Sequence, residues 1–450
     1  MFNLRVPLEA RDEVFLMNTL TDAQLIVSSD VGALLDRCEA EPLETTRLDD
    51  EERAAIELLS EHGFLVAGRE VEALALDRYF ETVKNDASEL NITVLTTLQC
   101  NFACGYCFQG DHGDYNKFAQ KMTLETSAAV ARWIERELDR IHPERLVLTF
   151  FGGEPLLNLP VMHDLAERLW AATELRAVRL AVNIITNGLL LTPAIVERFK
   201  PYGLNGIKIT LDGDRDTHNR LRPLRGGQGT FDRIVQNIRA CAGLVPISIG
   251  GNFDETSADS YPALLDFLAQ QEFADKLVKV NFKPVIGGRS ATPKNVLALT
   301  PVDASGKPLG GTCMTAAGVG ASGCGTCGLA EEKMTFVREE TTRRGFPTPN
   351  GIPGGPCHVH MTHAHTIGPD GSLYACPGFT GEKALSTGHI DDRHESWRES
   401  ARERFNRLHP WKAVASPTAH SSACGASLER LLTGCVLLHH CVCGARTRKC

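Results

Sequence analysis

The stretch CNFACGYC at residues 100–107 carries the residues of this chain best suited to metal chemistry. Its cysteines, Cys100, Cys104 and Cys107, are separated by three and then two residues. Three thiolates are one ligand fewer than a four-iron cluster can take from a protein, so one iron stays open. An open coordination position is typical of a catalytic site, whereas structural zinc usually has four protein ligands. We therefore predict a [4Fe–4S] cluster with an open iron site; a zinc loop or three unrelated buried cysteines are the alternatives.

The overall composition limits the class of protein and its compartment. The chain has 450 residues, 15 cysteines and a net charge of −9. An acidic chain without a basic stripe is a poor nucleic-acid binder, and no apolar run is long enough to span a bilayer. The N-terminal residues lack the basic and apolar regions of a secretory signal. We therefore expect a cytoplasmic protein with neither nucleic acid nor membrane as partner, whose cysteines stay reduced and bind metal.

Strand and helix patterns alternate from residue 91 to residue 285. Strands are predicted at 91–98, 145–151, 178–186, 206–211, 246–253 and 279–285. Helices are predicted between them at 123–140, 161–172, 193–202, 231–242 and 261–272. Six strands separated by five helices indicate βαβ units and a parallel sheet. The cysteine loop directly follows the first strand, at the end where such sheets carry their functional loops.

Motifs at the strand ends make this region similar to the radical S-adenosylmethionine (SAM) superfamily. The Cys-x3-Cys-x-aromatic-Cys motif, with Tyr106 as its aromatic residue, is the signature of that family. A GGEP segment (152–155) follows the second strand, where the family has the segment that holds the SAM ammonium. The segments TNG (186–188) and TLDG (210–213) follow the next two strands. Two glycines permit close backbone approach, and a carboxylate can pair with a cationic amine.

The resemblance extends from about residue 90 to residue 380 and implies a partial (β/α)6 TIM-type barrel. It implies that the open iron binds SAM and that an external one-electron donor, of flavodoxin or ferredoxin type, drives its reductive cleavage. The resulting 5′-deoxyadenosyl radical then abstracts a substrate hydrogen. Thr210 matches a position that contacts SAM in relatives, while Arg222 and Asn252 are candidates for its carboxylate and ribose. The full set of implied SAM contacts is Tyr106, Gly152, Gly153, Glu154, Thr210, Arg222 and Asn252.

A second cysteine region follows the barrel. The spacing from Cys357 through Gly371 to Cys376 resembles the opening half of the SPASM extension, which holds auxiliary iron–sulfur clusters in peptide-modifying members of the family. The segment 369–371 (PDG) predicts a hairpin turn there. We expect one or two auxiliary clusters, with Cys313, Cys324, Cys327, Cys357 and Cys376 as candidate ligands; Cys324 and Cys327 could equally form a zinc knuckle. The nearby histidines are interpreted as solvent-facing strand residues, with metal ligation by one of them as the alternative: His358, His360, His363 and His365.

The last segment departs from the SPASM pattern. The family pattern expects Cys-x2-Cys-x5-Cys-x3-Cys, whereas the final cysteines here are Cys424, Cys435, Cys441, Cys443 and Cys450. Acidic residues also become rare, since 414–450 contains a single one, Glu429. Our hypothesis is that this tail is a frame-shifted or otherwise aberrant product of the gene.

Residues 1–88 are expected to form a small separate unit. Short strands are predicted at 4–7, 14–18, 23–27 and 64–66, and helices at 30–37 and 51–61. These elements suggest a winged-helix-like module, with a plain N-terminal cap on the barrel as the alternative. The unit also resembles the PqqD-like modules that clamp peptide leaders, and such modules take up an extended chain at a sheet edge.

Together the resemblances favour a radical SAM maturase that modifies a side chain of a ribosomally made peptide, with a precursor peptide and its leader as partner. One alternative is a modifier of the anaerobic sulfatase-maturating type, but those relatives place an Asp after the second SPASM cysteine, where this chain has Pro377. Another is a non-catalytic iron–sulfur or zinc protein. The expected parts are a recognition module at 1–88, the partial barrel at 89–290, an irregular Cys-rich SPASM-like region at 291–412 and an atypical tail at 413–450.

Overall fold

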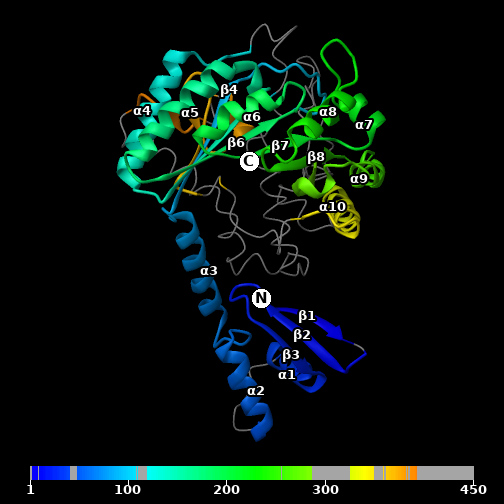
Figure 1. Cartoon of the computed structure of the whole chain (residues 1–450). Coiled ribbons are helices and arrows are strands. Elements are labelled where there is room, and N and C mark those ends of the chain that lie inside the picture. The colour runs from blue at the N-terminus through cyan, green and yellow to red at the C-terminus, as the bar shows by residue number, and fades with distance from the viewer. Residues whose placement is uncertain are drawn as a thin grey trace, which may run out of the picture.

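Two sheets organise the part of the chain that the structure describes. This computed structural model describes residues 3–8, 10–40, 48–107, 109, 119–254, 256–285, 325–348, 358, 361–381, 383 and 386–392. One sheet has three antiparallel strands near the N-terminus, and the other has nine strands in the main body (Figure 1). The larger sheet is mostly parallel and is flanked by helices, so the predicted α/β class is confirmed.

The N-terminal unit contains the first three predicted strands and the two predicted helices near their expected positions. Its elements are β1 (Asn3–Leu8), β2 (Glu13–Asn18), β3 (Gln24–Ser28), α1 (Ser29–Ala40), α2 (Asp50–Glu61) and α3 (Arg69–Lys84). Helix α2 begins with a capping box, in which the Asp49 carboxylate accepts from the Glu52 amide and the Glu52 side chain accepts from the Asp49 amide. These contacts satisfy two of the backbone donors that a helix leaves open at its start.

The strand expected at residues 64–66 is absent from this described segment. Phe64 instead donates its amide to the carbonyl of Leu59, 2.7 Å away, directly after α2. Its ring is 4% exposed and packs in a small core with Leu16, Leu35 and Leu59. The apolar run at residues 64–66 therefore folds back onto α2 instead of forming a strand. Burial of the Phe64 side chain outweighs the strand propensity of the run.

The six predicted parallel strands are confirmed and lie side by side in chain order. They are β4 (Glu89–Thr97), β5 (Arg145–Gly152), β6 (Arg179–Thr186), β7 (Leu204–Thr210), β8 (Ile247–Phe253) and β9 (Leu277–Pro284). The helices that follow them are α4 (Leu124–Ile141), α5 (Leu159–Glu174), α6 (Pro193–Phe199), α7 (Arg215–Leu221), α8 (Phe231–Cys241) and α9 (Tyr261–Ala269). Helix α7 was not predicted. This order brings the carboxyl ends of all six strands to one end of the sheet.

The helices are placed by caps and by apolar faces. Thr123 accepts the amide of Thr126 at 3.1 Å to begin α4, and His142 ends that helix in the left-handed conformation. Between these caps, Val130, Ile134 and Leu138 recur at helical spacing and are at most 1% exposed. They join one continuous core with the strands, which fixes the frame that carries the site.

Three further strands extend the sheet beyond the predicted barrel. They are β10 (Ala364–Ile367), β11 (Ser372–Tyr374) and β12 (Gly388–His389), and β10 pairs with β4 in parallel. The hairpin predicted at residues 369–371 is confirmed, with Gly371 at a φ of +89° between β10 and β11. His365 contradicts the solvent-facing interpretation, because it is 7% exposed and packs edge-on against Trp133 at 5.4 Å.

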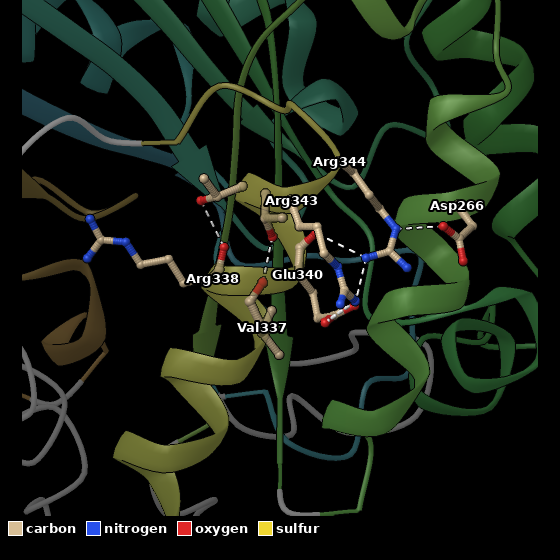
Figure 2. Close-up of polar contacts among 8 residues, drawn as sticks. Asp266, Val337, Arg338, Glu340, Arg343 and Arg344 are labelled. Carbon is tan, nitrogen blue, oxygen red and sulfur yellow. Dashed lines mark hydrogen bonds and ion pairs between the residues drawn. The ribbon is translucent and has the colours of Figure 1, made fainter. Parts of the chain in front are cut away.

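Helix α10 (Gly325–Arg343) packs against β9 and α9 and covers the β9 side of the barrel. Figure 2 shows how polar contacts hold its last turn, where Arg344 reaches across to α9. The Arg344 guanidinium lies 2.6 Å from Asp266 and 2.7 Å from Glu340. Among the described residues, no helix is both long and apolar enough to cross a membrane.

Candidate active site

The cysteine loop follows the carboxyl end of β4, and hydrogen bonds with the segment after α7 hold it in place. The amide of Ala103 donates to the carbonyl of Pro223 at 2.9 Å, and Arg225 donates to the carbonyl of Cys100 at 2.9 Å. Within the loop, the Cys107 amide donates to the Cys104 carbonyl at 3.2 Å. All three predicted cysteines are thus in the described structure, partly buried and without disulfides.

The thiols of this loop lie in an environment that favours the uncharged form unless a cation is present. Burial raises the pKa of Cys100 to about 12 and that of Cys104 to about 11, and neighbouring thiols add to this effect. In the described part of the chain, no three His, Cys, Asp or Glu side chains gather closely enough to hold one metal ion. A four-iron cluster binds each thiolate through a different iron, so its ligands do not converge on one ion. A bound cluster would also supply the positive charge that stabilises thiolates.

Gly152 and Gly153 approach the protein backbone closely. A Cβ at Gly152 would lie 2.3 Å from the carbonyl oxygen of Thr97, and one at Gly153 would lie 2.1 Å from that of Gln99. The Gly153 amide donates to Thr97 at 2.9 Å, and the Glu154 amide donates to Gln99 at 2.7 Å. The two glycines therefore let the end of β5 pack against the chain that leads into the cysteine loop.

The carboxylate of Glu154 is turned toward the protein. It is fully buried and accepts from the Thr186 hydroxyl at 2.7 Å, the Asn187 amide at 2.8 Å and the Leu156 amide at 3.0 Å. Burial raises the pKa of Glu154, and the hydrogen bonds oppose this effect. Protein donors contact both carboxylate oxygens, and the expected pairing of Glu154 with an ammonium stays a prediction. Glu154 also ties the end of β5 to the turn after β6.

That turn continues the connection to the cysteine loop. The side-chain amide of Asn187 donates to the side-chain oxygen of Asn101 at 2.7 Å. Asn101 lies between the first two cysteines, and its own side-chain nitrogen is buried without a hydrogen-bond partner in the described structure. Strands β5 and β6 are therefore linked through polar side chains to the loop that carries the cysteines.

Three of the predicted SAM contacts converge on a residue that was left unassigned, Asp212. The hydroxyl of Tyr106 donates to Asp212, and the guanidinium of Arg222 donates to the Tyr106 oxygen at 2.8 Å. Arg222 also lies 3.6 Å from the Asp212 carboxylate, and the backbone amide of Asn252 donates to Asp212 at 2.7 Å. Asp212 is fully buried, so the loop after β4, the end of α7 and strand β8 share one buried polar network.

A histidine orients this network. The Asp212 amide donates to Nδ1 of His218 at 3.1 Å, and Nε2 of His218 lies 3.1 Å from the Thr230 hydroxyl. Burial holds the pKa of His218 well below its ordinary value, so the ring is neutral and can accept at Nδ1. The signal that sequence reasoning missed was the spacing of Asp212, His218 and Arg222 after β7.

Arg222 has open hydrogen-bonding capacity that fits a carboxylate ligand. Its Nε is buried and has no hydrogen-bond partner in the described structure. Its charge also acts on Cys104, whose pKa it lowers against the effect of burial. Since a guanidinium recognises a carboxylate through two donors, an anion bound at Nε would lie beside the cysteine loop.

The structure describes some of the remaining predicted site residues and not others. Thr210 ends β7, in register with Gly250 of β8. Cys376 is described: it is 5% exposed, and its sulfur accepts the Gly378 amide at 3.4 Å. The other candidate auxiliary ligands lie outside the described residues; they are Cys313, Cys324, Cys357 and the side chain of Cys327. The tail from residue 393 also lies outside them.

Comparisons with known proteins agree with this geometry. Residues 94–259 match the Radical SAM superfamily. The Fe-coproporphyrin III synthase of Methanosarcina barkeri is 26% identical over 179 residues, which cover 39% of this chain and 40% of that protein. A GTP 3',8-cyclase from a Synechococcus strain is 32% identical over 146 residues, which cover 32% of this chain and 39% of that protein. The match thus spans about 40% of the length of these curated relatives.

A solved structure supports the fold. Native anSMEcpe with bound AdoMet, which is SAM, superposes with a TM-score of 0.51 at 15% identity, covering 74% of this chain and 83% of that one. The cysteine loop, the strand-end motifs and strands β5 to β8 lie within the matched region, which begins inside β4. Residues 94–259 therefore form a radical SAM superfamily domain, and membership in that superfamily implies a [4Fe–4S] cluster and SAM as its cofactors.

Proposed function

We propose that this chain is a radical SAM enzyme that modifies a side chain of a ribosomally made peptide. The observation that carries the radical SAM part is the convergence of the cysteine loop and the network of Tyr106, Asp212 and Arg222 at the carboxyl ends of the parallel strands. A site for radical chemistry needs a fixed cofactor and exclusion of water, and the buried Arg222–Asp212 ion pair with its hydrogen bonds supplies such a fixed frame.

The residues of this frame have distinct roles in the proposal. Cys100, Cys104 and Cys107 would ligate three irons, and Arg222 would bind the SAM carboxylate through its unpaired Nε. Tyr106 and Asp212 hold the Arg222 guanidinium in place. When bound, the cluster and SAM would supply the radical that removes a hydrogen atom from the substrate.

Thr210, Asn252 and the Gly152–Glu154 segment complete the proposed SAM site. Thr210 and Asn252 lie at the carboxyl ends of neighbouring strands and would offer polar groups to the ribose. In the Gly152–Glu154 segment the two glycines would let the backbone lie close to the ligand, and the Glu154 carboxylate, which also accepts from protein donors, would pair with the SAM ammonium.

The peptide part of the proposal is supported by the N-terminal unit. Within the described residues, β3 pairs with β2 on one side and has no strand on its other side. An extended leader could add to that edge through main-chain hydrogen bonds, as in a winged-helix-like recognition module. One or two auxiliary clusters on the candidate cysteines, an external donor of flavodoxin or ferredoxin type and a cytoplasmic location belong to the same proposal.

The test is formation of 5′-deoxyadenosine from SAM under dithionite by anaerobically reconstituted protein. We expect the wild type to form it and Cys100→Ala, Cys104→Ala and Cys107→Ala to fall to background. Cys38→Ala is the matched control, since Cys38 lies in α1 of the N-terminal unit. Iron-loaded wild type that forms no 5′-deoxyadenosine would instead indicate a non-catalytic iron–sulfur protein.

The peptide part has its own readout. The product of a short open reading frame beside the gene is incubated with the enzyme and SAM, and its mass is measured. A mass change that requires SAM supports the peptide substrate, whereas SAM cleavage without any change in such peptides argues for another substrate class.

A further inference from the structure

Lys208 of β7 faces the inside of the barrel, beside the proposed SAM site. Its strand neighbours Ile207 and Ile209 are 1% and 0% exposed and belong to the hydrophobic core. Side chains alternate along a strand, so Lys208 and Thr210 point to the opposite, inner face. Lys208 therefore lies one layer deeper in the barrel than Thr210, the residue predicted to contact SAM.

The neighbouring strand is shaped to make room for this lysine. A Cβ at Gly250 of β8 would lie 2.4 Å from Cε of Lys208 and 3.2 Å from its Nζ. The Lys208 side chain thus passes over β8 at Gly250, where the strand has no side chain to block it. Glycine weakens a strand interior, so its presence is explained by the close approach of the lysine.

The charges around Lys208 are positive. Burial, together with the charges of Lys283 and Lys279 on β9, lowers the pKa of Lys208 to about 8. Gly250 is in register with Asn281, which lies between these two lysines on β9. No carboxylate of the described chain forms a hydrogen bond or ion pair with Lys208. The nearby Asp212 is already engaged by Tyr106, Arg222 and Asn252.

A half-buried ammonium without a counter-charge is costly, and an entering anion would offset that cost. We propose that Lys208 binds a carboxylate of the substrate on the inner face of the barrel, next to the SAM site. This inference rests on the proposed peptide function and deepens it, because a peptide supplies carboxylates from acidic side chains or from its C-terminus. The substrate would thus be held by an acidic group close to the position that reacts.

The experiment measures acetylation of single lysines in the reconstituted holoenzyme at pH 7 with SAM bound, by peptide mass mapping. The probes are N-acetylglutamate α-amide for a side-chain carboxylate, N-acetylglycine for a C-terminal carboxylate, the neutral N-acetylglutamine amide, and inorganic phosphate. Each unit by which an anion raises the pKa of an amine lowers its unprotonated fraction, and hence its acetylation rate, about tenfold. Lys200, an exposed lysine 2.6 Å from Glu197, is the internal reference.

We expect one of the two carboxylate probes to slow acetylation of Lys208 about tenfold while that of Lys200 is unchanged, and the more effective probe identifies the source of the carboxylate. Gly250→Ala should abolish this protection, because the added Cβ displaces the flexible end of Lys208. Equal protection by N-acetylglutamine amide, protection by phosphate only, or no protection would overturn the proposal. Formation of 5′-deoxyadenosine is measured in the same samples, so failure of the radical SAM function is seen separately.

Discussion

The buried carboxylate of Asp212 is the residue on which the proposed site most depends. It joins Tyr106 of the cysteine loop, Arg222 after α7 and the backbone of Asn252 on β8. Arg222 is 8% exposed, and Asp212 is the described carboxylate with which it forms an ion pair. Removing one partner of a buried ion pair leaves an uncompensated charge, which is more costly than removing both.

Asp212→Asn should therefore destabilise the protein strongly. We expect a loss of about 3 kcal/mol in the free energy of unfolding, together with loss of SAM binding. Asp259→Asn is the matched control, because Asp259 is 70% exposed in its 2.8 Å pair with Lys333 and should cost less than about 1 kcal/mol. Urea unfolding measures both variants, and equal small losses would show that the Asp212 network carries little energy.

Because the Lys208 ammonium is half-buried, the free energy of unfolding of the protein should depend on pH. Its pKa is about 8 in the folded chain against an ordinary value of 10.5, so between these values the unfolded chain binds more protons. The free energy of unfolding should therefore rise with pH in this window, and below it the contribution is constant. We expect the stability of the wild type relative to Lys208→Met to increase by about 3 kcal/mol from pH 7.5 to pH 10.5.

Urea titrations at several pH values measure this difference. Lys200→Met, at an exposed site, provides the comparison for removing any lysine. A difference between the wild type and Lys208→Met that does not change with pH would show that Lys208 is hydrated in the folded protein.

At the scale of elements, the contact between the end of β5 and the chain after β4 positions the cysteine loop. Gly152 and Gly153 press against the backbone of Thr97 and Gln99, and no side-chain rearrangement can relieve a Cβ placed there. Glu154 then links the same strand end to β6. The loop geometry is thus set by backbone packing between neighbouring strands.

Gly153→Ala should disturb this contact. We expect a destabilisation of about 2 kcal/mol or more and lower iron incorporation on reconstitution, because a Cβ would lie 2.1 Å from a carbonyl oxygen. Gly206→Ala in β7 is the control, since its Cβ would meet its nearest atom at 3.5 Å and should change stability by less than about 0.5 kcal/mol. Iron content and unfolding are measured on both, and normal iron loading in Gly153→Ala would contradict the role assigned to this contact.

At the scale of the whole molecule, the described chain has two separate hydrophobic cores. The N-terminal core of Leu16, Leu35, Leu59 and Phe64 shares no residue with the barrel core. Figure 1 shows α3 running between the N-terminal sheet and the barrel. Peptide recognition by the N-terminal unit and radical chemistry in the barrel can therefore belong to different parts of the protein.

Removal of residues 1–68 tests this division. We expect the truncated protein to retain most of its SAM cleavage, because the barrel core is intact, while peptide modification at low peptide concentration falls about 100-fold through loss of the second contact. Unchanged peptide modification would show that the N-terminal unit is a structural cap. Loss of SAM cleavage would show that the barrel needs it for folding.

The amino-acid sequence by itself determined the local features of this protein. The six parallel strands, most of their helices, the hairpin at residues 369–371 and the cysteine loop after β4 follow from periodicity, turn residues and spacing between near neighbours. Each of these depends on contacts within a few residues, so local chemistry is sufficient to predict them.

The tertiary structure decided which distant groups meet. Asp212 lies 106 residues from Tyr106, Glu154 lies 32 residues from Thr186, and Lys208 crosses Gly250 of another strand. The extension of the sheet by β10 beside β4, and the turning of Glu154 toward protein donors, depend likewise on strand order and register. Such pairings are set by how the whole sheet closes, and no pattern of neighbouring residues encodes them.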